Sequence, residues 1–88
     1  MTALTDRIEG VLLGTAAGDA LGAPYEFQPP RGPQLPVEMT GGGPWEPGEW
    51  TDDTAMALAL ADSLVTRKCL DVRDVADRYC AWMEDGRY

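Results

Sequence analysis

A hydroxyl group and two adjacent carboxylates stand together at residues 51–54, which read Thr51-Asp52-Asp53-Thr54. These side chains offer hard oxygen ligands, which suit Mg²⁺ or Mn²⁺. The chain contains no histidine, so a typical zinc or copper site is not expected. A second interpretation stays open at this point, because a Thr at a helix N-cap followed by Asp in the first turn is ordinary helix chemistry.

The segments on either side of this motif indicate where it lies. A loop rich in Gly and Pro precedes it at residues 41–50, and an Ala- and Leu-rich run follows it at residues 55–65. We therefore expect the motif at the start of a helix over residues 52–66. That helix is apolar almost all round, which predicts burial on most of its sides, with Asp62 facing water.

A first helix is predicted over residues 4–21, with a capping-box pattern formed by Asp6 and Glu9 at its start. Glycines recur every four residues along it: Gly10, Gly14 and Gly18. Glycine costs about 1 kcal/mol per residue inside a helix, so this spacing needs a reason. Either another helix or a ligand at the C-terminal end approaches the helix closely.

An acidic side chain, Asp19, lies near the end of this first helix in the sequence Gly18-Asp19-Ala20-Leu21-Gly22. The helix dipole disfavours a negative charge at a C-terminus, so we expect the carboxylate to have a compensating partner. The predicted partner is a Thr or a backbone N–H rather than a metal, with Asp19 acting as an acceptor behind the metal ligands.

Residues 22–50 show neither helical nor strand periodicity and hold all seven prolines of the chain. An irregular stretch of this length indicates a functional loop or a disordered linker. Its aromatic residues favour a loop that is anchored on a core: Tyr25, Phe27, Trp45 and Trp50. Shielding of a site or stacking on a substrate ring is the alternative role for the two tryptophans.

A third helix is predicted over residues 71–84, with Asp71 as its N-cap and Gly86 as its C-terminal stop. Its charged residues are expected on a solvated face: Asp74, Asp77 and Arg78. The resulting fold class is all-α, with a long irregular loop between the first two helices. Because these helices cannot cover their own apolar faces, we expect residues 1–88 to be the incomplete N-terminal part of a larger all-α domain.

Composition restricts the possible partners and compartment. The net charge of −8 suits divalent cations and disfavours binding to nucleic acid or to an anionic membrane surface. No signal peptide is visible, and the longest weakly apolar stretch, residues 11–23, is too short to span a bilayer. Cys69 and Cys80 lack metal-site spacing, so a reducing, cytoplasmic compartment is expected.

Three features in this order resemble the ADP-ribosylglycohydrolase family, and most closely its dinitrogenase reductase-activating glycohydrolase branch. The sequence Gly18-Asp19-Ala20-Leu21-Gly22 is followed by Glu26-Phe27, and the glycines Gly41-Gly42-Gly43 then lead to Thr51-Asp52-Asp53-Thr54. The resemblance covers residues 7–66 and, more faintly, residues 79–82. The combination is specific, although each motif alone is weak.

The resemblance implies a larger all-α domain with a dinuclear Mg²⁺ or Mn²⁺ centre. Its members hydrolyse the N- or O-glycosidic bond between ADP-ribose and a protein side chain, or cleave related conjugates. The family's Thr-Asp-Asp step binds the metal pair, which implies that Thr51, Asp52 and Asp53 are ligands here. A glutamate after the first motif lies near the scissile bond in some members, which makes Glu26 the candidate acid/base or water-positioning residue.

One departure from the family pattern bears on activity. The second ligand cluster of the family, an Asp-x-Asp-Thr sequence in the C-terminal part, is absent from this sequence. We therefore expect an enzyme segment that needs the missing C-terminal part of the domain and is inactive alone. The alternative is a non-catalytic helical module that is derived from the same family and serves binding or structure.

Overall fold

The computed structural model describes residues 2–88, and regular structure within them is helical: α1 (Ala3–Gly22), the 3-10 helix η1 (Ala23–Tyr25), α2 (Asp52–Arg67) and α3 (Val72–Asp85). The predicted all-α class, with a long irregular segment after the first helix, is therefore confirmed. The chain divides into two compact units, one ending at Thr51 and the other beginning at Asp52.

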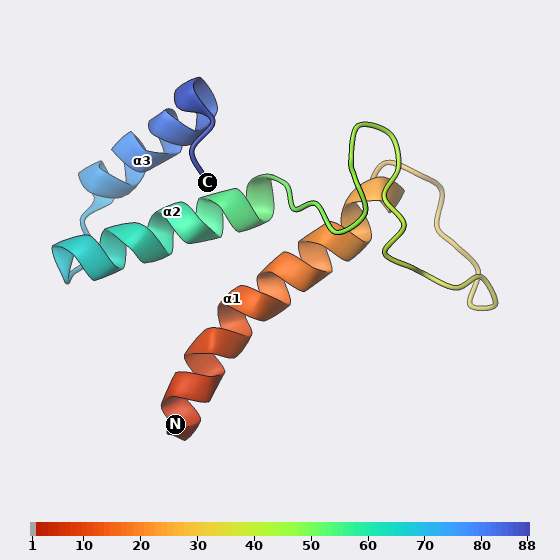
Figure 1. Cartoon of the computed structure of the whole chain (residues 1–88), viewed down its shortest axis with the longest axis horizontal. Helices are drawn as coiled ribbons and strands as arrows, with labels where there is room; N and C mark the ends of the chain where they lie inside the picture. The colour runs from red at the N-terminus through yellow and green to blue at the C-terminus, as the bar shows by residue number, and fades with distance from the viewer. Residues whose placement is uncertain (1) are drawn as a thin grey trace. The chain divides into compact units, whose positions relative to one another are not determined.

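In the first unit, α1 begins one turn before the predicted capping box. Thr2 is the N-cap, and its extended backbone lets its hydroxyl accept a hydrogen bond from the Thr5 N–H at 3.1 Å. The prediction that Asp6 and Glu9 cap this helix is therefore wrong. At the other end the Ala23 N–H donates to the Asp19 carbonyl, and η1 continues the chain for three residues before the irregular loop (Figure 1).

The glycine stripe of α1 has no close neighbour among residues 2–88. A Cβ atom added at Gly10, Gly14 or Gly18 would meet no atom within 4 Å. Several large apolar side chains of the same helix are more than half exposed: Leu4, Ile8, Val11 and Leu13. Close approach by a further helix or a ligand therefore stays a prediction.

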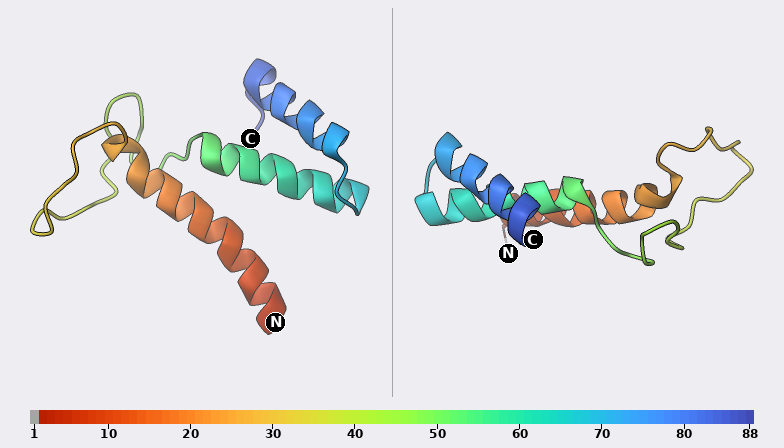
Figure 2. Two further views of the ribbon diagram at one scale, coloured as in Figure 1. Left: turned by 180° about the vertical axis from the view of Figure 1, so that it is seen from behind. Right: turned by 90° about the horizontal axis from the view of Figure 1, so that it is seen from above.

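In the second unit, α3 folds back along α2 (Figures 1 and 2). The buried residues of α2 are small: Thr54, Ala55, Ala59 and Ser63. Small side chains at a spacing of four residues form one narrow stripe, whereas Leu64 and Val65 remain 42% and 75% exposed. Every residue from 54 to 63 is buried or partly buried, so the predicted burial of the apolar run holds in part, and it ends where the exposed residues 64–67 begin.

A charged network joins α2 to α3. Arg78 donates from Nη1 to Asp62 Oδ2 at 2.7 Å and from Nε to Asp74 Oδ2 at 2.8 Å. The Tyr88 hydroxyl donates to the same Asp62 oxygen at 2.6 Å. Arg78 is only 15% exposed, so its predicted place on a solvated face is wrong, because an acid of the neighbouring helix lies within its reach.

One member of this network, Asp74, has a perturbed pKa. The buried Ser63 hydroxyl lies close enough to lower the pKa of Asp74, and hydrogen bonding from Arg78 lowers it further. Within residues 2–88 the Ser63 hydroxyl nevertheless has no hydrogen bond of good geometry. The 2.8 Å hydrogen bond from Arg78 is therefore the main interaction that stabilises the ionised Asp74 carboxylate.

The ends of α3 follow the sequence closely. Asp71 accepts a hydrogen bond from the Asp74 N–H at 3.0 Å, and Gly86 ends the helix in the left-handed conformation, as predicted. Cys69 and Cys80 are free and exposed. Among the helices of residues 2–88, none has the combination of length and apolar character that crossing a bilayer requires.

Adding bulk at Ala59, which is fully buried, should loosen α2. Overpacking of a filled site costs about 1–3 kcal/mol, so Ala59→Leu should speed amide hydrogen exchange in the middle of α2 by roughly tenfold or more. Ala76→Leu on the exposed side of α3 is the matched control and should change exchange little. Equal effects of the two substitutions would contradict the close packing around Ala59.

Candidate metal-binding site

Thr51 is held by the carboxylate of Asp19. The Thr51 backbone N–H donates to Asp19 Oδ2 at 2.8 Å, and its hydroxyl donates to Asp19 Oδ1 at 2.6 Å. Both bonds are partly buried and lie within the first unit. They offset the unfavourable position of a carboxylate near the C-terminus of α1. The prediction that Asp19 pairs with a Thr or a backbone N–H is confirmed, since Thr51 supplies both.

Asp52 and Asp53 are the first two residues of α2, so the predicted position of the motif at the start of a helix is confirmed. Both side chains are exposed, and Asp52 Oδ1 accepts a hydrogen bond from the Asp53 N–H at 3.0 Å. The positive end of the helix dipole favours carboxylates in this first turn, whether or not a cation is bound.

The chemistry of these donors fits part of a divalent cation's ligand shell. One hydroxyl and two carboxylates, consecutive in the chain, are the oxygen donors that Mg²⁺ and Mn²⁺ prefer. Across residues 2–88, however, no group of three or more His, Cys, Asp or Glu side chains gathers into a metal site. The described residues thus fit an incomplete shell, and metal binding by Thr51, Asp52 and Asp53 stays a prediction.

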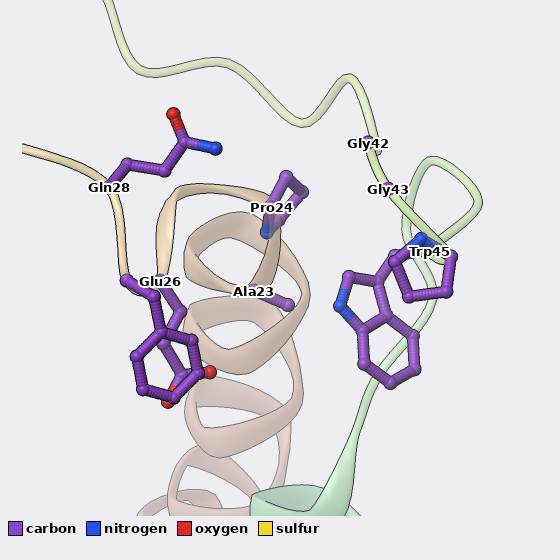
Figure 3. A pocket seen from close by; sticks show the side chains of 9 residues that line it. Ala23, Pro24, Glu26, Gln28, Gly42, Gly43 and Trp45 are labelled. Carbon is purple, nitrogen blue, oxygen red and sulfur yellow. The ribbon is translucent and has the colours of Figure 1, made fainter.

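Glu26 lines a hollow of about 340 Å³ in the first unit. The hollow surrounds the end of η1, with Glu26 on one side of Pro24 and Trp45 on the other (Figure 3). Glu26 is exposed and makes no side-chain hydrogen bond or ion pair with another described residue. The structure therefore does not join Glu26 to Thr51, and its catalytic role stays a prediction.

The aromatic residues of the loop behave differently from one another. The Tyr25 hydroxyl donates to the Glu38 carbonyl at 3.0 Å and accepts from the Glu38 N–H at 3.2 Å, so it links two parts of the loop that are 13 positions apart. Phe27 is 98% exposed and has a φ of +65°, which is unusual for a bulky residue. Anchoring of the loop on a core is therefore wrong for Phe27 within the described residues.

A tight glycine turn, which no sequence-based prediction above anticipates, precedes Thr51 in the loop. Gly42 and Trp45 exchange backbone hydrogen bonds of 2.9 and 3.0 Å. A Cβ atom on Gly41 would lie 2.7 Å from the Pro47 nitrogen and from the Trp45 carbonyl oxygen. The signal was present in the run Gly41-Gly42-Gly43, because consecutive glycines accompany backbones that are closely packed or have positive φ.

Comparison with known proteins gives a match along the whole chain. The family model described as ADP-ribosylglycohydrolase matches residues 1–88. An ADP-ribosylarginine hydrolase Tri1 from Serratia proteamaculans is 43% identical over 83 residues, covering 92% of this chain and 22% of that protein. An ADP-ribosyl-[dinitrogen reductase] glycohydrolase from Rhodospirillum rubrum is 44% identical over 86 residues, covering 90% of this chain and 29% of that protein.

A vertebrate protein is also similar. The ADP-ribosylhydrolase ARH3 of Bos taurus is 35% identical over 83 residues, covering 83% of this chain and 23% of that protein. The chain therefore spans between about a fifth and a third of the length of these relatives.

Substitution of Gly41 should open the glycine turn. Gly41→Ala places a methyl group against the backbone of residues 45–47 at a φ of +71°, so the Gly42 and Trp45 amides should lose hydrogen-exchange protection. Gly43→Ala is the matched control, because it has a similar φ of +59° but no atom within 4 Å of the new methyl group. Retained protection in the Gly41 variant would refute the described turn.

Proposed function

This chain belongs to the ADP-ribosylglycohydrolase family, and we propose that it supplies Thr51, Asp52 and Asp53 to the metal centre of a hydrolase that removes ADP-ribose from proteins or related conjugates. The observation that carries the proposal is the hold of Asp19 on Thr51, because it fixes the residue directly before the two acids that begin α2. Mg²⁺ or Mn²⁺ is the proposed ion.

The names of the relatives support this substrate class. Two of them are named for hydrolysis at ADP-ribosylarginine and at ADP-ribosyl-[dinitrogen reductase]. We therefore propose an ADP-ribosylated protein as the partner and an N- or O-glycosidic bond as the target. We also retain the cytoplasmic compartment as part of the proposal, because the thiols of Cys69 and Cys80 are free and exposed.

Cleavage of a ribosyl bond develops oxocarbenium character at the anomeric carbon. When bound, divalent ions supply orientation of ribose hydroxyls and a bound water of lowered pKa. In this chain Thr51, Asp52 and Asp53 would hold the ions, and Asp19 keeps Thr51 in place. Glu26 would position the attacking water or move a proton, and its exposed carboxylate is accessible for that role.

A non-catalytic helical module of the same ancestry is the second candidate. Its support is that Asp52 and Asp53 lie in the first turn of α2, where the helix dipole favours carboxylates without a cation. The two candidates differ in their need for both acids, because a helix N-terminus gains little from a second adjacent carboxylate. Substitution of each acid therefore separates them.

In a full-length relative that carries the same Thr-Asp-Asp-Thr sequence, Asp52→Asn and Asp53→Asn should each lower hydrolysis of ADP-ribosylarginine strongly. Loss of an outer partner of a metal ligand costs about 10–100-fold, so loss of a ligand should cost at least about 100-fold. Circular dichroism should remain unchanged, since exposed Asp residues contribute little to stability. Activity within about twofold of the parent in both variants would refute the assignment.

The 88-residue chain alone should show no turnover of an ADP-ribosylarginine substrate and should bind Mn²⁺ weakly. Its described residues provide only part of a ligand shell, and the exposed apolar residues of α1 should promote association and binding of an apolar dye. Turnover that Asp52→Asn abolishes would overturn this expectation. So would a cooperatively melting monomer that binds no dye.

A further inference from the structure

Thr51 presents both of its polar hydrogens to one side chain. The N–H and the hydroxyl of Thr51 donate to different oxygens of Asp19, at 2.8 and 2.6 Å, across 32 positions of sequence. A tether between the loop and α1 needs only one of these bonds. The second bond, which is also the shorter, acts on the hydroxyl that is the proposed metal ligand.

The direction of the second bond has a chemical consequence. A hydroxyl group has one hydrogen to donate and two lone pairs, whereas an ionised carboxylate can only accept. Because the hydroxyl hydrogen of Thr51 is directed at Asp19, the lone pairs of Oγ1 are what it can offer to another group. Cations bind hydroxyl oxygens through lone pairs, so this orientation is the one that ligation requires.

We propose that Asp19 is a positioning residue of the metal centre, which fixes the hydroxyl of Thr51 as an acceptor toward the ion and holds its rotamer. This inference rests on the proposed function. In this arrangement Asp19 acts on the cation through Thr51 and does not itself touch it. Outer partners of this kind orient metal ligands and raise their donor strength, and their loss commonly weakens metal binding by about 10–100-fold.

Asp19→Asn separates the positioning role from a simple tether. The carbonyl oxygen of Asn can still accept from the Thr51 N–H, so the loop keeps an attachment to α1. Its amide nitrogen, however, donates toward Thr51 Oγ1 and occupies a lone pair there. If Asp19 only attaches the loop to α1, Asp19→Asn should leave metal binding unchanged. If Asp19 orients the Thr51 hydroxyl, Asp19→Asn should weaken metal binding.

The experiment titrates Mn²⁺ into the ¹⁵N-labelled 88-residue chain and measures paramagnetic broadening of the amide resonances of residues 51–53. Broadening is expected at millimolar Mn²⁺ in the parent chain. Asp19→Asn and Thr51→Val should each raise the half-broadening concentration about tenfold. In the Thr51→Val background, adding Asp19→Asn should have an effect of less than about twofold, because the two residues act as one unit.

Asp6→Asn is the matched control, because it removes the same charge from the exposed first turn of α1 and should change the titration by less than about twofold. Absence of localised broadening in the parent, or its persistence in Asp53→Asn, would overturn the metal centre itself. An effect of Asp53→Asn without one of Asp19→Asn would overturn only the role of Asp19. Additive effects of Asp19→Asn and Thr51→Val would do the same.

Exchange of the Thr51 amide hydrogen with solvent shows whether the tether has survived in each variant. If Asp19→Asn loses that protection, Thr51→Val still tests the hydroxyl on which the inference depends, because it keeps the N–H bond to Asp19 and removes only the hydroxyl. An unchanged Mn²⁺ titration in Thr51→Val would overturn the inference.

Discussion

The two hydrogen bonds between Asp19 and Thr51 set the point at which the irregular loop ends and α2 starts. Closing a loop across 32 positions costs about 3 kcal/mol beyond a constant term. Hydrogen bonds to a charged group contribute about 1.5–3 kcal/mol each, so two of them are of the size required. The Tyr25 contacts with Glu38 and the turn at Gly42 and Trp45 shorten the free segments within that loop.

The sequence predicted the helices well where local chemistry decides them. Periodicity placed α2 and α3 within one residue of their observed ends, and Asp71 and Gly86 marked the ends of α3 because caps act over only a few residues. The ends of α1 were also predicted within one residue, but its cap was not, since several residues near the start are acceptable caps and Thr2 is the one whose hydroxyl accepts from a backbone N–H. The pairing of Arg78 with Asp62 depends on how two helices meet, which periodicity does not reveal.

In the candidate site, too, local sequence predicted some features, whereas others depend on how distant segments meet. The residue types and the position of Thr51, Asp52 and Asp53 at a helix start followed from local sequence. The kind of partner for Asp19 followed from the helix dipole, but the choice of Thr51 among the hydroxyl groups of the chain required the loop's path. Glu26 became a candidate only through the family resemblance. Its neighbours in the hollow include residues 42–45, and no local sequence pattern predicts that this later part of the loop lies next to Glu26.

The loop that joins α1 to Thr51 also acts as a tether that raises the effective concentration of one partner around the other. The exposed side chain of Phe27 makes this loop a ready target for a chymotrypsin-like protease. A cut there would leave Asp19 and Thr51 intact while removing the covalent link between them. Contact between Asp19 and Thr51 would then be a bimolecular association. The extent to which it persists on dilution would show how much of its stability comes from the covalent loop and how much from the hydrogen bonds between the two residues.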